Sequence, residues 1–438
     1  MVTVLIRGDE KMNRRLIEEE LSAYTVDPLA FLTEKARQTD VIRLHQKSGK
    51  SMYFLLHPDD IKEVLVTQHH LFVKGRGARL VKIMLLGDGI ITTDGDQHRK
   101  ARTMMNPHFR ASDIASYVKI MVRETNAMLD HWSNGGMINI NHEMARLVLR
   151  ITNRSLFGYE IEQDIEPFIN GIWKISELMR HQNTPSLSVK NPRNIIRELD
   201  KIVYGMMEKY RSNPKQSRHT LLATLMESDM SNEAIRDQIM SMTAASFETT
   251  ASALTWTLYL LCQHPECIEN IVQEAKTYEC GDRSPDIHTL NGLVYTSAVI
   301  KESLRLYPPS WALTREATED VNIHGVMYPQ ASDIYIPQYI LHRDERYFEK
   351  PNQFLPERFL PGSPAPSPYV YFPFGLGPRS CIGMNFAIME ISTVLSLLLS
   401  RFTLHIPEDQ PPLTPQIGFS MTPSNLYVQA KRQHPIFV

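Results

Sequence analysis

The feature that most constrains the fold is a long helical stretch in the middle of the chain. It opens near Ser231-Asn232 and runs to His264-Pro265. At about 1.5 Å per residue such a helix is roughly 48 Å long, enough to cross a whole domain. The pattern from about residue 96 to 305 is mostly helical, whereas residues 310–380 are rich in proline, glycine, tyrosine and short β-like runs. We therefore expect a mainly α protein with a smaller β-rich part, an α+β fold with the long helix at its centre.

The same change in residue composition and pattern predicts the domain organisation. We expect one domain over residues 1–438, with its β-rich parts at about 40–57, 306–375 and 401–435 and its helical parts at about 58–305 and 381–400. Residues 41–56 have the pattern of a hairpin, two alternating strands around a polar, glycine-containing turn. His57-Pro58 then ends the second strand, and Asp59 or Asp60 is expected to cap a short helix.

Composition excludes several classes of protein. The 438 residues carry a net charge of -2, which gives no overall reason to bind nucleic acid or an anionic membrane. The N-terminal apolar run, Val4 to Ile6, is far shorter than the roughly 20 residues of a membrane span, so we expect a soluble, cytoplasmic protein without a membrane anchor in this sequence. Four cysteines without a C-x-x-C pair argue against a zinc ribbon, an iron–sulfur cluster or a disulfide scaffold, and favour a reducing compartment.

The most informative short segment is FGLGPRSCIG, residues 374–383. Gly375, Gly377 and Gly383 allow tight turns and a close approach of the backbone to a ligand. Cys381 is expected at the start of the following helix, where amide groups and the helix dipole favour a thiolate able to bind a metal. The alternative is that Cys381 is a small buried apolar side chain, the commoner fate of a lone cysteine.

This segment resembles the haem-binding signature of the cytochrome P-450 family, F-x-x-G-x-R-x-C-x-G, and matches it at every fixed position. The resemblance implies the cytochrome P-450 fold, with the long helix over a haem b group. It also implies that Cys381 is the axial ligand of the iron. Phe374 would shield the sulfur, Gly377 and Gly383 would line the loop, and Arg379 would meet a haem propionate.

A second motif is Glu302-Ser303-Leu304-Arg305, which places an acid and a base at i and i+3 on one helix face. By itself it could be an ordinary intrahelical ion pair worth roughly 0.2–0.5 kcal/mol. In the cytochrome P-450 family, E-x-x-R joins an arginine in a later P-E-R-F segment, so the resemblance implies Arg358 as the third member. The implied role is support of the haem pocket.

A third motif lies within the long helix, at Ala244-Ala245-Ser246-Phe247-Glu248-Thr249-Thr250. A threonine inside a helix usually donates a hydrogen bond to the carbonyl one turn earlier. Similarity to the family's oxygen-activation motif A-G-x-E-T-T instead implies Thr249 and Glu248 as a catalytic pair that delivers protons. Ser246 departs from the family glycine and is a candidate for substrate contact.

Further cations are implied to neutralise the haem propionates. The family often has W-x-x-x-R where this chain has His98 and Arg102, and histidine can still donate to a carboxylate. A solvated histidine on a basic helix is the alternative for His98. Arg315 matches a family arginine that also meets a propionate.

The resemblance implies a haem-thiolate monooxygenase that inserts one atom of O2 into a lipophilic small molecule by hydroxylation or epoxidation. No fused redox module fits in the sequence, so electrons from NAD(P)H should arrive through a ferredoxin or flavoprotein reductase. We expect Arg99 and Lys100 to assist its docking, and we expect a monomer. The alternatives are a peroxide-driven or isomerising haem-thiolate enzyme and a non-catalytic haem sensor.

By family analogy the substrate pocket draws on four stretches of the chain, and its lining is mostly apolar, which suits a fatty acid, terpenoid or polyketide. Core packing would explain the same residues almost as well. The candidate pocket residues are Leu85, Met242, Ala245, Ser246, Trp311, Leu313 and Phe419.

Overall fold

The helix α11 (Asn232–Gln263) has 32 residues and is the longest described element. The Ser231 hydroxyl caps it by accepting a hydrogen bond from the Ala234 amide at 3.2 Å, which satisfies one of the amides that every helix start leaves without a partner. The helix ends at Gln263, two residues before Pro265, the first residue of the next helix. Both ends confirm the prediction from the sequence.

The structure, a computed structural model, describes residues 14–46, 50–180, 192–214, 219–277 and 287–433. The N-terminal apolar run, Cys280 and the end of the predicted β-rich part, 434–435, lie outside these residues. The chain divides into two compact units. Unit 1 comprises Met1–Leu80, Ser310–Gln353 and Pro366–Cys381, and unit 2 comprises Val81–Pro309, Phe354–Ala365 and Ile382–Val438. The single domain expected from the sequence stays a prediction.

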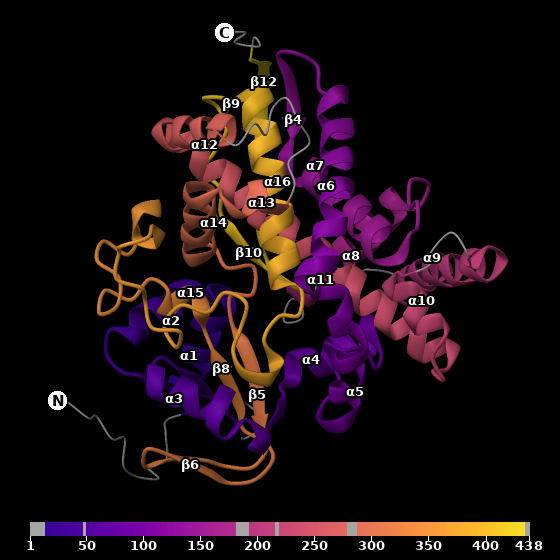
Figure 1. The fold of residues 1–438 in the computed structure, drawn as a ribbon. Helices are drawn as coiled ribbons and strands as arrows, with labels where there is room; N and C mark the ends of the chain where they lie inside the picture. The colour runs from indigo at the N-terminus through magenta and orange to yellow at the C-terminus, as the bar shows by residue number, and fades with distance from the viewer. Residues whose placement is uncertain (1–13, 47–49, 181–191, 215–218, 278–286, 434–438) are drawn as a thin grey trace. The chain divides into compact units, whose positions relative to one another are not determined.

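Unit 1 is built on a five-stranded sheet of order β1-β2-β8-β5-β3 (Figure 1). Its strands are β1 (Val41–His45), β2 (Ser51–Leu55), β3 (Phe72–Lys74), β5 (Leu313–Ala317) and β8 (Asp333–Ile336). β1 and β2 pair antiparallel, with Val41 opposite Leu55, which confirms the predicted hairpin. β2 and β8 pair in parallel, so the sheet joins distant parts of the chain. Because side chains alternate along a strand, Tyr53 and Leu55 enter one buried cluster while Met52 and Phe54 enter another.

Short elements complete unit 1, with α2 packed against β1 and α15. They are α1 (Arg14–Val26), α2 (Pro28–Ala36), α3 (Pro58–Lys62), η1 (Glu63–Thr67), η2 (His69–Leu71), α4 (Arg76–Val81), β6 (Val321–Ile323), β7 (Val326–Tyr328), α15 (Gln338–Leu341) and η8 (Gly377–Arg379). The expected cap of α3 is wrong. The His57 ring accepts a hydrogen bond from the Asp59 amide at 3.3 Å, and Asp59 and Asp60 lie inside the first turn, where their charges complement the helix dipole.

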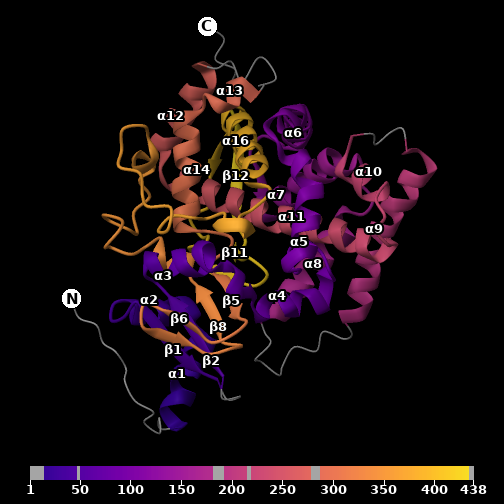
Figure 2. The same ribbon diagram turned by 60° about the horizontal axis from the view of Figure 1, so that its bottom comes forward.

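Unit 2 is a helical assembly around α11, which packs along α7 and contacts α9, α12, α14 and α16 (Figures 1 and 2). Its helical elements are η3 (Lys82–Leu86), α5 (Gly95–Met105), η4 (Asn106–Phe109), α6 (Ala111–His131), α7 (Ile140–Thr152), η5 (Asn153–Phe157), α8 (Ile165–Arg180), α9 (Pro192–Ser212), α10 (Leu221–Met226), α12 (Pro265–Thr277), α13 (Ile287–Asn291), α14 (Val294–Leu306), η7 (Pro356–Phe359) and α16 (Met384–Arg401). Most side chains of α11 are buried, as expected for a helix surrounded by other helices.

Two small sheets close unit 2. One has the order β4-β12-β9, and the other is the hairpin β10–β11. The strands are β4 (Gly136–Asn139), β9 (Phe402–His405), β10 (Pro415–Ile417), β11 (Met421–Pro423) and β12 (Tyr427–Arg432). Among the described helices, α16 alone is long and apolar enough to cross a membrane, but 67% of it is buried inside the protein, as in an ordinary core helix.

Candidate active site

The cysteine segment forms a tight loop in unit 1. The Cys381 amide donates a 2.8 Å hydrogen bond to the Phe374 carbonyl, which closes the loop. Gly375 and Gly377 have φ of 72° and 67°, a left-handed conformation that glycine adopts without strain. A Cβ on Gly377 would lie 2.1 Å from the carbonyl oxygen of Leu65, so only glycine fits there. The loop therefore presents Cys381 in one defined backbone geometry.

The Cys381 side chain is exposed, so the alternative of a small buried apolar residue is wrong. The expectation that Cys381 begins the next helix is also wrong, because α16 begins at Met384 and its N-cap is Gly383. Gly383 has φ of −91°, so it needs no left-handed turn. Since dipole effects are confined to the first helical turn, they contribute less at Cys381 than the sequence suggested.

Two arginines of unit 1 belong to the same region as the loop. Leu313 of β5 has its Cδ1 3.7 Å from the point where a Cβ on Gly375 would lie, which places the start of β5 beside the loop. Arg315 lies two residues further along the strand and therefore on the same face. It is buried, and its Nη1 donates to the Thr314 carbonyl at 2.8 Å. Arg379 is half-buried within the loop. A thiol and two guanidinium groups thus come from one part of unit 1.

In unit 2, α5 carries His98 and Arg102 one turn apart, hence on the same helix face. His98 is buried and Arg102 is half-buried, so the alternative of a solvated His98 is wrong. Arg99 and Lys100 are exposed, and Arg99 forms a 2.7 Å ion pair with Asp96.

Between Gln238 and Leu261, three residues of α11 interrupt an otherwise buried surface. Ala245, Ser246 and Thr249 are only half-buried, and their spacing places them on one helix face. The Thr249 hydroxyl donates to the Ala245 carbonyl at 2.6 Å, the ordinary hydrogen bond of a helical threonine. The Ser246 hydroxyl donates to the Thr243 carbonyl at 3.1 Å. A hydroxyl has one donor and two acceptor sites, so Thr249 keeps its capacity to accept a hydrogen bond from a ligand.

Glu248 is 2% exposed, and among the described residues neither carboxylate oxygen has a hydrogen-bond partner. Burial raises the pKa of Glu248 to about 7, although the Ser176 and Ser420 hydroxyls and the charge of Arg180 oppose the shift. The two hydroxyls lie near the carboxyl group without forming hydrogen bonds of normal geometry. An acid with this pKa can both give and take a proton near neutral pH.

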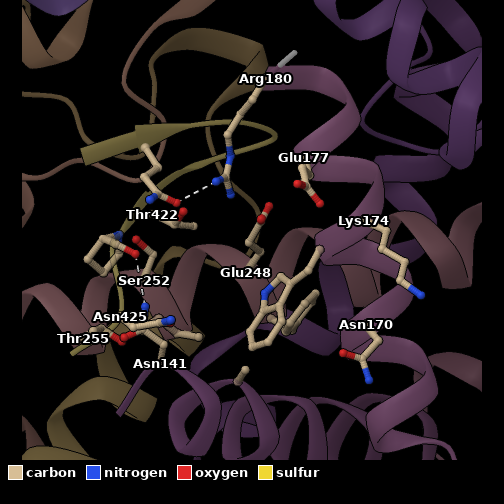
Figure 3. A pocket seen from close by; sticks show the side chains of 16 residues that line it. Asn141, Asn170, Lys174, Glu177, Arg180, Glu248, Ser252, Thr255, Thr422 and Asn425 are labelled. Carbon is tan, nitrogen blue, oxygen red and sulfur yellow. Dashed lines mark hydrogen bonds between the residues drawn. The ribbon is translucent and has the colours of Figure 1, made fainter. Parts of the chain in front are cut away.

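Glu248 lines a pocket of about 280 Å³ within unit 2, and Figure 3 shows its side chain rising from α11 toward Arg180 of α8. Most of the other lining residues are polar. They are Asn141, Asn170, Lys174, Glu177, Arg180, Ser252, Thr255, Gln416, Thr422 and Asn425, with Ala145, Trp173, Phe247, Ala251 and Pro423. This pocket was not predictable from the sequence, because its residues come from α7, α8, α11, the β10–β11 hairpin and the segment after it, and share no motif.

The hairpin β10–β11 is fastened to both neighbouring helices. Arg180 of α8 donates to the Gln416 side chain at 2.6 Å. The Phe419 amide donates to the Ser176 hydroxyl at 3.1 Å. Ser252 of α11 donates to the Met421 carbonyl at 2.7 Å. These bonds fix the hairpin tip that carries Phe419.

Glu302, Arg305 and Arg358 lie together in unit 2. Arg305 forms two 2.7 Å hydrogen bonds to the two oxygens of Glu302. Arg358 approaches the same carboxylate at 3.3 Å, and the Leu355 amide donates to it at 2.9 Å. Glu302 and Arg305 form the intrahelical ion pair of the alternative, but they are fully buried and share the carboxylate with Arg358, so the pair is not an isolated one.

The remaining predicted pocket residues are divided between the two units. In unit 2, Leu85 and Met242 are buried and Phe419 is half-buried. In unit 1, Trp311 and Leu313 are half-buried and pack against the two core clusters, which gives both a structural role in that unit.

Comparisons with known proteins agree with the site. The cytochrome P450 family model matches residues 27–430. The chain is 31% identical over 415 residues to cyclooctatin synthase of Streptomyces melanosporofaciens, covering 90% of each chain. It is 28% identical over 399 residues to pentalenene oxygenase of Streptomyces avermitilis, covering 87% of this chain and 88% of the relative. The fold matches the crystal structure of a cytochrome P450DA heme domain with a TM-score of 0.84, at 23% identity and over 94% of both chains.

The thiol loop, the fold and these matches define a haem-thiolate enzyme. The chain belongs to the cytochrome P450 family. It is a monooxygenase whose cofactor is haem b, whose electrons come from a redox partner and whose substrate is a lipophilic small molecule. The side chains present fit this cofactor, since the exposed Cys381 thiol is a soft iron ligand and Arg315 and Arg379 can neutralise two carboxylates.

Proposed function

We propose that this enzyme oxidises a lipophilic, ring-containing alkene or alkenol of the terpenoid class. Two relatives are named pentalenene oxygenase and cyclooctat-9-en-7-ol 5-monooxygenase, names that denote an alkene and an alkenol. The second is 30% identical over 397 residues. The apolar side chains of Leu85, Met242 and Phe419 support a hydrocarbon ligand, because such pockets gain affinity mainly from burial of apolar surface.

For the cofactor, Cys381 would bind the iron, with Phe374, Gly377 and Gly383 around the ligand loop. When bound through a thiolate, haem iron activates dioxygen and supplies the oxidising chemistry. Arg315, Arg379, His98 and Arg102 would hold the two propionates by charge-assisted hydrogen bonds. Glu302, Arg305 and Arg358 would stiffen the support of the haem pocket without touching it.

The observation that carries the oxygen-dependent reaction is that a buried acid, Glu248, and a half-buried hydroxyl, Thr249, are adjacent on α11. Insertion of one oxygen atom converts R–H, O2, two electrons and two protons into R–OH and water, so protons must be delivered to a site that excludes bulk water. Glu248 has a pKa of about 7 and faces a polar pocket. It can therefore take a proton from that pocket, while Thr249, the next residue on α11, would accept a hydrogen bond and orient the proton acceptor.

A peroxide-driven or isomerising enzyme needs no such proton relay, and a haem sensor needs no turnover at all. Replacing Thr249 by Ala separates these possibilities. We expect product formed per NAD(P)H consumed to fall at least about tenfold, because proton delivery loses its acceptor. The matched control is Thr243→Ala. Thr243 is a buried threonine on the same helix, and its hydroxyl donates an equivalent 2.9 Å hydrogen bond to the Ile239 carbonyl, one turn earlier. Unchanged coupling in Thr249→Ala would support the peroxide-driven alternative.

The substrate class and the iron ligand have separate tests. Bicyclic and tricyclic terpene alkenes and alkenols should shift the haem spin state at lower concentration than a linear fatty acid such as lauric acid. Tighter binding of the fatty acid would remove the terpenoid assignment. The reduced carbon monoxide adduct should absorb at the long wavelength of a thiolate complex, and Cys381→Ala should lose that band; retention of the band would exclude Cys381 as ligand.

The redox partner would be a ferredoxin or a flavoprotein reductase, and the exposed cations Arg99 and Lys100 of α5 would assist its docking. Exposed cations contribute mainly at low ionic strength, so reversal of both charges should slow electron transfer in low salt and have little effect in high salt. We further propose that the protein is cytoplasmic and monomeric. Sedimentation of the holoenzyme would test the monomer, and cell fractionation would test the location.

A further inference from the structure

Three consecutive polar residues near the start of α11 hold a distant segment of the chain. They are Arg236, Asp237 and Gln238. Arg236 and Gln238 are only 7% and 3% exposed. Buried polar groups are retained only when hydrogen bonds satisfy them, so the partners of these side chains identify what they hold.

Arg236 joins three elements of unit 2. Its Nη1 donates to the Leu85 carbonyl of η3 at 2.7 Å. Its Nε donates to Asp200 of α9 at 2.6 Å, and its Nη1 also donates to the adjacent Asp237 at 2.9 Å. The guanidinium group therefore ties η3 and α9 to α11 through charge-assisted bonds, the stronger class of hydrogen bond in proteins.

Asp237 and Gln238 hold the backbone that follows η3. The Asp88 amide donates to Asp237 at 2.7 Å, and the Ile90 amide donates to the Gln238 side-chain oxygen at 2.9 Å. The Gln238 amide group returns a bond to the Asp88 carbonyl at 3.1 Å. This stretch is neither helix nor strand. Side chains of α11 therefore satisfy backbone groups that regular structure would otherwise satisfy.

The glycines of this segment let its backbone lie directly on α11. Gly87 has φ of 53°, and a Cβ there would lie 2.2 Å from the Asp237 carboxylate. A Cβ on Gly89 would lie 1.8 Å from the Ser241 hydroxyl. No side chain separates the two surfaces at these positions, so residues 85–90 cannot move away from α11 without breaking the hydrogen bonds described above.

We propose that Arg236, Asp237 and Gln238 form a clasp, a set of positioning residues that fixes segment 85–90 and so sets the size of substrate the enzyme accepts. This inference rests on the proposed function, because it uses the assignment of Leu85 to the substrate pocket. The clasp residues do not touch the substrate. They act through the buried apolar side chains of Leu85, Leu86 and Ile90, which they hold in one arrangement.

The first test measures the clasp without any substrate. Amide hydrogen exchange of the holoenzyme reports the opening of the peptide that contains Asp88 and Ile90. Gln238→Leu keeps the side-chain size but cannot form hydrogen bonds to this segment, and Asp237→Ala removes the carboxylate that accepts from the Asp88 amide. We expect its exchange to accelerate about tenfold or more in both variants. The matched control is Glu233→Gln, which also neutralises an acid in the first turns of α11, at an exposed position.

The second test measures ligand size directly, with imidazole and the bulky 1-tritylimidazole as haem-iron ligands. Once segment 85–90 can open, the association rate of the bulky ligand should rise about tenfold while that of imidazole stays the same. Unchanged exchange in the variants would overturn the clasp, and faster exchange with an unchanged ratio of the two rates would overturn its role in selectivity. A failure of the proposed function is distinguishable, because lauric acid would then bind wild-type holoenzyme more tightly than the terpene ligands, whatever the exchange and association rates of the variants.

Discussion

Two glutamates of unit 2 have the same side chain and nearly the same burial, yet opposite surroundings. Glu302 on α14 accepts hydrogen bonds from Arg305, Arg358 and the Leu355 amide. Glu248 on α11 faces a polar pocket and has no hydrogen-bond partner in the parts of the chain that the structure describes. Burial alone therefore does not define what a carboxyl group does. Its partners decide whether it acts as a fixed structural charge or as a group that exchanges protons.

The largest expected effect is on the paired acid. Glu302→Gln removes the charge that balances the buried guanidinium group of Arg305 and the half-buried one of Arg358, which should lower the free energy of unfolding by about 3–5 kcal/mol and reduce haem content. Denaturant unfolding and the haem-to-protein ratio measure both quantities. The control is Glu357→Gln, an exposed neighbour of Arg358, with an expected change within about 0.5 kcal/mol. A stable, haem-replete Glu302→Gln protein would remove the contrast with Glu248.

The unpaired acid should respond in activity instead. Glu248→Gln keeps the shape of the side chain but cannot give up a proton, so turnover should fall on the order of 10²-fold while the folded structure persists. Product formation under saturating reductase measures the effect. Glu177→Gln is the control, because Glu177 lines the same pocket but is exposed, and its turnover should stay close to that of the wild type. Equal losses in both variants would assign the effect to the pocket rather than to Glu248.

The pKa of Glu248 also predicts how stability depends on pH. Its folded value, about 7, lies above the ordinary value of 4.5, so the folded state binds the proton more tightly than the unfolded state. The resulting stabilisation is complete below about pH 4.5 and is lost as the pH rises to about 7, by at most about 3 kcal/mol. The melting temperature of wild type relative to Glu248→Gln should therefore fall across this window and level off above it. A constant difference from pH 5 to 8 would contradict the raised pKa.

The smallest effect is expected at Glu390 of α16, a third buried acid. Within the described part of the chain neither of its oxygens has a hydrogen-bond partner, and burial raises its pKa well above the ordinary value. Burial therefore favours the neutral form of this acid, and Glu390→Gln should change the free energy of unfolding by less than about 1 kcal/mol and leave turnover intact. Chemical denaturation at pH 7 provides the measurement. A loss as large as that of Glu302→Gln would indicate that Glu390 is ionised and paired.

The sequence predicted best the features that depend on residues close together in the chain. The ends of α11 follow from Ser231 and Pro265, and the turns of the Cys381 loop follow from Gly375 and Gly377. The local sequence was misleading where several neighbouring residues could each cap the same helix. His57 caps α3 although Asp59 and Asp60 are commoner caps, because its ring reaches the Asp59 amide.

Features built from distant residues gave no signal in the sequence. Arg236 contacts Asp200 and the Leu85 carbonyl, which are far from it in the chain, and nothing in the spacing of these residues indicates that they meet. The environment of Glu248 is similar, since Asn141, Arg180 and Gln416 line its pocket from three separate elements. The identity of Glu248 was predictable from its motif, but its lack of partners was not.

The parallel pairing of β2 with β8 has a consequence for biosynthesis. β2 leaves the ribosome early, but its partner Asp333–Ile336 is made only after Val81–Pro309, the largest part of unit 2. At typical translation rates of roughly 5–20 residues per second, the edge of the nascent hairpin stays unpaired for on the order of tens of seconds. During that interval its apolar residues Phe54 and Leu55 are exposed to chaperones and to other nascent chains.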